Sequence, residues 1–131
     1  MISPTGSTRI RSDSMGGGHF GAARGRRKHA GADYTVTPGA HIVAPIDGRV
    51  TRIAKPYADQ PYSGLVIESP AMAVKMFYFE PLDGIVGQEV KEGMVIGHAQ
   101  DISKLHGEDM IPHIHLQIDR VSMDPADWIT D

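Results

Sequence analysis

The chain contains no cysteine among its 131 residues. Disulfide bonds and thiolate metal ligands are therefore excluded, and any metal ion must bind to His, Asp or Glu. A chain of this length fits one domain whose core needs no covalent cross-links, because roughly two-thirds of its unfolded surface can be buried.

An apolar run of about 18 residues is also absent, which excludes a membrane-spanning helix. The first four residues lack the apolar segment of a signal peptide, so we expect a protein that is cytoplasmic when made and leaves by a route that the sequence does not show. Thirteen Lys and Arg against sixteen Asp and Glu give a formal net charge of −3. This balance gives little support for nucleic-acid binding.

Long helical periodicity is the third absence, and short strand-like segments between turns take its place. These segments are residues 41–45, 49–54, 64–68, 74–79 and 111–118, and residues 90–97 predict two further short strands around Glu92-Gly93. Residues 124–128 predict a capped final helical turn. The pattern favours an all-β fold, a compact antiparallel sheet or sandwich with minimal helix. Residues 1–17, rich in Gly and Ser, are expected to form an irregular arm before a domain of residues 18–131.

Two histidines lie two positions apart in the last predicted strand, at His113 and His115. Side chains alternate between the faces of a strand, so both imidazoles point the same way. Ile114, Leu116 and Ile118 share the other face, which we expect to lie against the core. The strand is therefore a rigid platform on which both imidazoles can serve one reaction centre.

His29 and Asp33 form an earlier pair of metal-ligand types, with Gly31 between them. Gly31 disfavours a helix here, so we expect the backbone to bend at this glycine and Asp33 to open a strand. A catalytic zinc ion commonly takes three protein ligands and leaves a fourth position for water. The early pair and the late histidines supply three ligands and one spare imidazole, either His113 or His115, that can act as a base or an electrostatic stabiliser.

The His29-x-Gly31-x-Asp33 and His113-x-His115 motifs resemble the signature motifs of the lysostaphin-type (LytM-like) zinc endopeptidases. Residues 39–50 and 86–97 resemble the conserved hairpin and Val-Gly turn of that family, and the similarity runs in order over residues 18–128. The resemblance implies a β fold with one zinc ion in a groove, held by His29, Asp33 and His115. His113 would then be one of the two catalytic histidines.

The second catalytic histidine of that family is missing. It normally lies in a Tyr-x-His segment before the Val-Gly turn, but this chain has no histidine between His41 and His98. Residues 74–78 and Pro81 instead look like the leukocyte-derived chemotaxin branch, which keeps the zinc ligands and is regarded as having lost peptidase activity. Tyr78 or Glu80 is expected at the vacant position, and a tyrosine hydroxyl could still donate a hydrogen bond to an oxyanion.

Two functions follow from the resemblance. The first is a zinc-dependent endopeptidase that cleaves the peptide part of bacterial peptidoglycan, in lysis or remodelling of the wall, as a phage-type lysin would. The second is a zinc-stabilised binding module of the chemotaxin type, which the missing histidine favours. The absence of cysteine argues against a secreted animal protein of that kind, since small secreted domains usually depend on disulfides.

Overall fold

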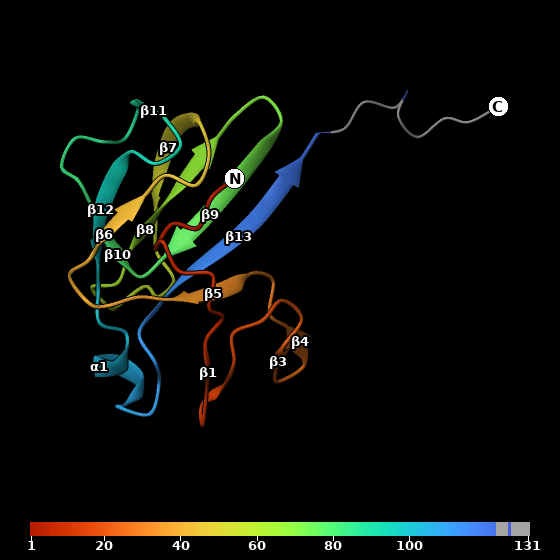
Figure 1. The fold of residues 1–131 in the computed structure, drawn as a ribbon, viewed down its shortest axis with the longest axis vertical. Helices are drawn as coiled ribbons and strands as arrows, with labels where there is room; N and C mark the ends of the chain where they lie inside the picture. Colours follow the sequence, from red (N-terminus) through yellow and green to blue (C-terminus); the bar gives the residue numbers. More distant parts are fainter. Residues whose placement is uncertain (123–125, 127–131) are drawn as a thin grey trace.

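A computed structural model describes residues 1–122 and 126 of the chain. These residues form antiparallel strands and one short helix, α1 (Ser103–His106) (Figure 1). The largest sheet has the order β11-β7-β8-β9-β13-β5. Its strands, in chain order, are β5 (Ala32–Thr35), β7 (Gly48–Ala54), β8 (Gly64–Glu68), β9 (Met72–Phe77), β11 (Glu89–Val90) and β13 (His113–Val121). The all-β fold expected from the sequence is confirmed.

A second sheet of three strands packs against the first and encloses the core. Its order is β10-β12-β6, formed by β6 (His41–Val43), β10 (Phe79–Pro81) and β12 (Val95–Ala99). Side chains of the two sheets meet in one apolar cluster, which includes Ile42 and Phe79 from the small sheet and Leu65, Met76 and Ile114 from the large one. All five are fully buried.

Two small hairpins precede the large sheet. They are formed by β1 (Ser12–Asp13) with β2 (Gly16–Gly17), and by β3 (Ala23–Arg24) with β4 (Arg27–Lys28). Residues 1–17 are less irregular than expected, because the arm lies along β5: Arg11 N–H donates to the Asp33 carbonyl, and Thr35 N–H donates to the Arg9 carbonyl. The side chain of Arg11 is buried as a result.

Several predicted strands occur where the sequence places them, with two differences. Residues 74–79 are not one strand, since Tyr78 separates β9 from β10. Ile118 is not a core residue: it is 48% exposed, and the apolar core cluster reaches along β13 only to Leu116. The predicted helical turn at residues 124–128 lies outside the described residues except for residue 126. Among the described residues, no helix is both long enough and apolar enough to cross a membrane.

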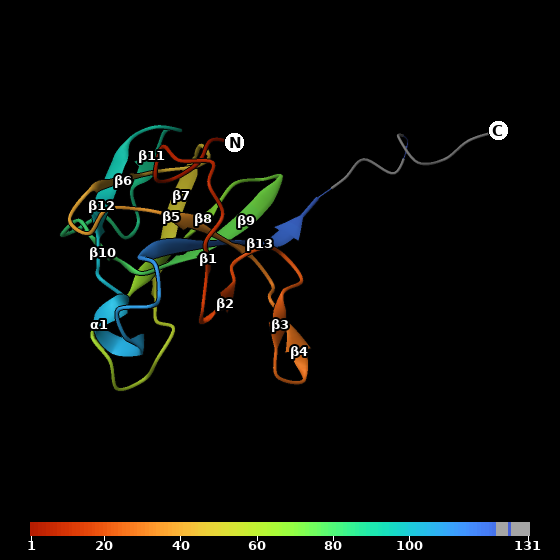
Figure 2. The ribbon, with the colours of Figure 1, turned by 60° about the horizontal axis from the view of Figure 1, so that its bottom comes forward.

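A groove lies on one side of the large sheet. Figure 2 shows that the β3–β4 hairpin, α1 and the loop between β7 and β8 project from the same side. Residues of β9 and β13 line the groove together with that hairpin, with residues 55–57 of the loop and with His106 of α1.

Candidate metal centre

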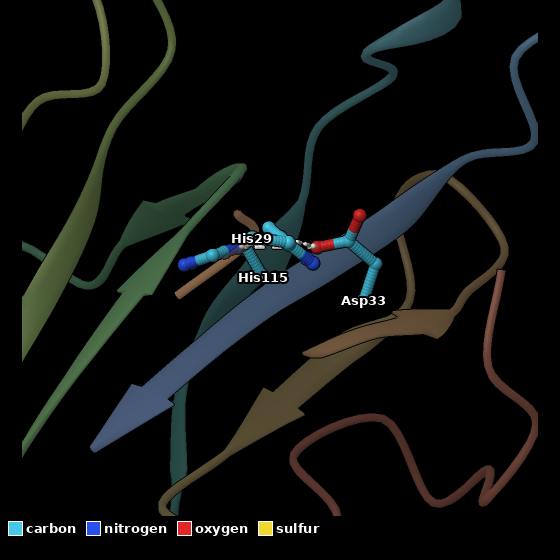
Figure 3. Close-up of side chains that lie close together, drawn as sticks. All are labelled: His29, Asp33 and His115. Atoms are coloured by element: carbon cyan, nitrogen blue, oxygen red, sulfur yellow. Dashed lines mark hydrogen bonds and ion pairs between the residues drawn. The ribbon is translucent and has the colours of Figure 1, made fainter. Parts of the chain in front are cut away.

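Strand pairing brings two of the predicted ligands together. Asp33 of β5 and His115 of β13 are direct partners across the antiparallel pair. His29 precedes β5 and points to the same place, so that the three side chains converge (Figure 3). All three are buried, with 3–8% of their surface exposed.

Gly31 is required by the close approach of β13 rather than by an unusual backbone conformation. A Cβ atom at this position would lie 2.8 Å from the imidazole of His115 and closer still to the Leu116 carbonyl oxygen. Only glycine therefore lets the segment between His29 and Asp33 pass over the strand that carries His115.

Each of the two imidazoles has a hydrogen-bond acceptor on its far side, away from the other converging side chains. His29 Nδ1 lies 3.1 Å from the carbonyl oxygen of His19, and His115 Nε2 lies 2.8 Å from Gln117 Oε1. The Gln117 amide group is itself oriented, because its Nε2 donates to Asp119. Both partners are acceptors. With the ring protons donated to them, His29 Nε2 and His115 Nδ1 have lone pairs that face Asp33 and could bind a cation there.

Three acceptor atoms consequently face one another. His29 Nε2 lies 2.9 Å from His115 Nδ1. Asp33 Oδ1 lies 3.2 Å from the first nitrogen and 3.1 Å from the second. A tetrahedral zinc ion with bonds of about 2.0–2.1 Å would separate its ligand atoms by about 3.3 Å. The donor types and spacings thus fit a small divalent cation, and a carbonyl or amide acceptor behind each imidazole is the usual outer partner of a metal-bound histidine.

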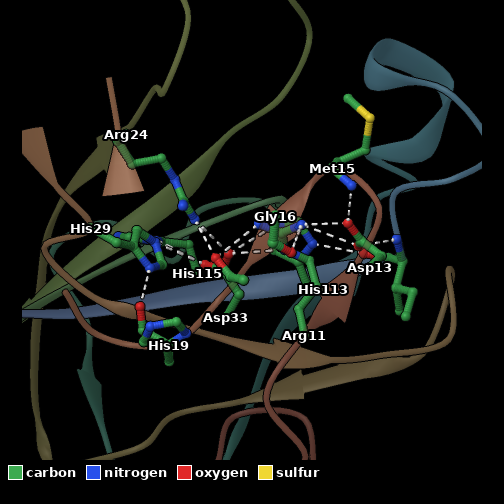
Figure 4. A network of polar contacts seen from close by, with 12 residues as sticks. Arg11, Asp13, Met15, Gly16, His19, Arg24, His29, Asp33, His113 and His115 are labelled. Atoms are coloured by element: carbon green, nitrogen blue, oxygen red, sulfur yellow. Dashed lines mark hydrogen bonds and ion pairs between the residues drawn. The ribbon is translucent and has the colours of Figure 1, made fainter. Parts of the chain in front are cut away.

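The second carboxylate oxygen of Asp33 belongs to a buried ion-pair network (Figure 4). Arg11 Nε donates to Asp33 Oδ2 at 3.2 Å, and Arg11 Nη1 contacts both carboxylate oxygens of Asp13. Burial acts to raise the pKa of Asp33, but its contacts with His115, His113 and His29 outweigh burial, so the pKa lies below its ordinary value. Asp33 is therefore ionised and available as a ligand.

His113 lies beside the three converging residues, on the same face of β13 as His115. Its Nδ1 lies 2.8 Å from the Ile111 carbonyl oxygen, which leaves Nε2 as the acceptor, 3.6 Å from Asp33 Oδ2. Burial lowers the pKa of His113 and favours the neutral imidazole. Because His113 and His115 both line the groove while Ile114 is fully buried, the predicted alternation of faces holds over this part of the strand.

Tyr78 and Glu80 occupy very different places. Tyr78 has φ of 82°, which is unusual for a bulky residue, at the point where the chain leaves the large sheet for the small one. Its ring meets the edge of His113 at a centroid distance of 5.2 Å, and it lines the groove. Glu80 is exposed on β10, opposite His98. The structure therefore places Tyr78, and not Glu80, beside His113.

Several residues of the site could not be found by motif. Arg11 lies in the segment expected to be an irregular arm, and Gln117 was recognised only as part of the last strand, although it follows His115 by two positions and must share its face. Tyr57 and His106 join the groove through a hydrogen-bonded chain, in which the Tyr57 hydroxyl lies 3.0 Å from His106 Nε2 and 3.3 Å from the Tyr78 hydroxyl. No motif or spacing in the sequence links Tyr57, Tyr78 and His106.

Comparisons with known proteins agree with this geometry. A protein-family model described as Peptidase family M23 matches residues 27–127. Mouse leukocyte cell-derived chemotaxin-2 is 28% identical over 107 residues, which are 80% of this chain and 69% of that protein.

Three solved structures share the fold. Csd3 of Helicobacter pylori has a TM-score of 0.66 and 23% identity over the whole of this chain, which spans 33% of the Csd3 chain. The catalytic domain of the antimicrobial peptidase lysostaphin of Staphylococcus simulans has a TM-score of 0.57 and 21% identity, covering 90% of this chain and 91% of that one. A zinc-containing peptidase from Vibrio cholerae has a TM-score of 0.62 and 25% identity, covering 88% of this chain and 35% of that one.

Proposed function

Because the chain belongs to peptidase family M23, we propose that it is a zinc-dependent endopeptidase that hydrolyses peptide bonds of bacterial peptidoglycan. The observation that carries this proposal is the convergence of three acceptor atoms, from His29, Asp33 and His115, beside a fourth buried imidazole in a groove. When bound there, zinc supplies a Lewis acid that activates water and polarises a peptide carbonyl.

The residues around the three ligands have the properties that such a reaction needs. His113 presents an unprotonated Nε2 to the groove, and its lowered pKa keeps it able to accept a proton at neutral pH. Burial raises the pKa of Tyr78 far above that of a free tyrosine, so its hydroxyl stays protonated. Tyr78 therefore acts as a hydrogen-bond donor toward a developing oxyanion and not as a base.

The second candidate function is a zinc-stabilised binding module. The similarity to leukocyte cell-derived chemotaxin-2 and the missing histidine favour it. Losing one oxyanion donor lowers the rate of comparable enzymes by about 10²–10³, which leaves measurable catalysis. We give the hydrolase precedence because His113 and Tyr78 still lie together beside the proposed metal ligands.

A direct experiment separates the two functions. Purified peptidoglycan is incubated with the zinc-loaded protein, with the protein in excess EDTA, and with His113→Gln. New amino groups released only by the zinc-loaded wild type would support the endopeptidase. Binding to peptidoglycan with no amino groups released over a day would reject the endopeptidase and leave the binding module. In either case we propose that the protein acts at the bacterial cell wall, as a released or phage-associated factor.

A further inference from the structure

The groove beside the proposed metal site is strongly basic. Six Lys or Arg side chains line it, and among the described residues Asp33 is the only carboxylate in the lining. The whole chain, in contrast, has a net charge of −3. A cleft lined by one sign of charge concentrates ligands of the opposite sign, so the groove is suited to an anionic ligand although the protein is acidic.

Arg24 is the basic side chain of this lining that is both fixed and accessible. Its Nη1 donates to the Ala23 carbonyl and its Nη2 to the Gly17 carbonyl, each at 2.9 Å. The side chain remains 28% exposed. A guanidinium group has five N–H donors, so two backbone hydrogen bonds orient it and leave others for a ligand.

No carboxylate of the described residues neutralises Arg24 at hydrogen-bonding distance. Its ion-pair partner is Asp33, whose Oδ2 lies 3.8 Å from Arg24 Nη2, and that oxygen already accepts a hydrogen bond from Arg11 Nε at 3.2 Å. Arg11 in turn is paired with Asp13. Figure 4 shows the side chain of Arg24 directed toward Asp33, beside the proposed metal site. Because its nearest carboxylate oxygen is shared with Arg11, the charge of Arg24 is incompletely satisfied.

We propose that Arg24 forms a carboxylate-binding subsite, and that the ligand of the groove is a peptide with a free carboxylate close to the bond presented to the metal. The inference rests on the proposed function for the identity of that bond. A guanidinium binds a carboxylate through two parallel hydrogen bonds, which gives both affinity and orientation. A neutral segment such as a run of glycines would leave Arg24 without this partner.

The test compares two peptides of one sequence. N-acetyl-trialanine with a free carboxyl terminus and the same peptide with a carboxyl-terminal amide are titrated calorimetrically into the zinc-loaded chain. The wild type should bind the free acid about tenfold more tightly than the amide. Arg24→Gln should reduce this preference to about twofold or less, whereas Arg26→Gln should keep it. Arg26 is the matched control because it lies in the same hairpin turn but is exposed and does not line the groove.

Two further measurements make the outcome decisive. Zinc content and the thermal midpoint show whether Arg24→Gln folds and keeps its metal. If Arg24→Gln does not fold, Arg24→Lys takes its place. Arg24→Lys keeps the charge but not the paired donors, so it should show an intermediate preference for the free acid. Equal affinity of the wild type for the free acid and the amide would overturn the inference. A folded Arg24 variant that keeps the full preference for the free acid would also overturn it, because the metal itself would then recognise the carboxylate.

The result is independent of whether the protein is an enzyme. A retained acid preference without release of amino groups from peptidoglycan would reject only the endopeptidase. Cleavage of peptidoglycan without any acid preference would reject only the Arg24 subsite.

Discussion

Replacing His115 with alanine is expected to abolish stoichiometric zinc binding. The substitution removes the nitrogen that lies 2.9 Å from His29 Nε2 and 3.1 Å from Asp33 Oδ1. Two donor atoms would remain, one fewer than the three protein ligands that a catalytic zinc ion commonly has. The fold should survive, because the imidazole faces the groove while its neighbour Ile114 supplies the core contact.

The size of the effect can be worked out from linkage. A ligand that binds only the folded chain stabilises it by about 2.7 kcal/mol when its free concentration is 100 times its dissociation constant. For a domain of this size, 1 kcal/mol changes the thermal midpoint by about 4 °C. The wild type should therefore melt about 10 °C higher with zinc than with EDTA, and His115→Ala should melt at the same temperature in both.

The assay combines elemental analysis after dialysis with thermal melts in zinc and in EDTA. His98→Ala is the matched control, since His98 is an exposed strand histidine outside the groove. It should retain one zinc ion and the full thermal shift. One tightly bound zinc ion in His115→Ala, with an unchanged shift, would refute the assignment of this histidine as a ligand.

The remaining predictions concern the surroundings of the ligands. Gln117→Leu removes the acceptor behind His115 and should weaken zinc binding about 10–100-fold in a chelator competition assay; an unchanged affinity would contradict the proposed orientation of this imidazole. Tyr78→His should increase amine release from peptidoglycan by up to about 10²–10³-fold. Glu80→His should not increase it, because residue 80 is exposed on the small sheet. An increase with Glu80→His and none with Tyr78→His would instead assign the vacant position to residue 80. Arg11→Met should destabilise the zinc-free protein by about 3–5 kcal/mol in urea unfolding, since Asp13 loses its buried partner; a loss below about 1 kcal/mol would show that the network contributes little.

The sequence predicts most strands of the large sheet, because each is marked by a local run or alternation of apolar residues between turns. Residues 64–68 were predicted as a strand and form β8 over the same range. They are an apolar run between turns, and β8 has a strand on both sides, so its whole environment favours the extended state. Ile118 shows the limit of this reasoning. Alternation predicts which face a side chain lies on, but its burial depends on whether the core covers that face, and the core cluster ends at Leu116.

The convergence of His29, Asp33 and His115 was expected from the family resemblance, but the residues that surround them were not. His29 and Asp33 are close in sequence, and His115 is related to them by a family pattern. The contact between Arg11 and Asp33, in contrast, joins positions 22 residues apart through the docking of a Gly-rich arm. No local periodicity encodes such a contact. The positive φ of Tyr78 likewise occurs where the chain crosses from one sheet to the other. This crossing is a feature of the tertiary structure, and no residue pattern in 74–79 predicts it.

The position of Tyr78 beside His113 indicates which roles of the missing histidine in a hydrolytic reaction Tyr78 can take over, and which it cannot. A histidine can donate a hydrogen bond and can also exchange protons at neutral pH. Tyr78 can donate a hydrogen bond but does not give up its proton at neutral pH, because burial raises its pKa and keeps the hydroxyl protonated. Proton acceptance would then fall to His113, whose lowered pKa suits that role. Neither residue belongs to the proposed ligand set, so substitutions at Tyr78 or His113 should change hydrolysis without removing zinc. If this chain binds zinc and a peptide but does not cleave the peptide, it has lost proton transfer and not its metal site.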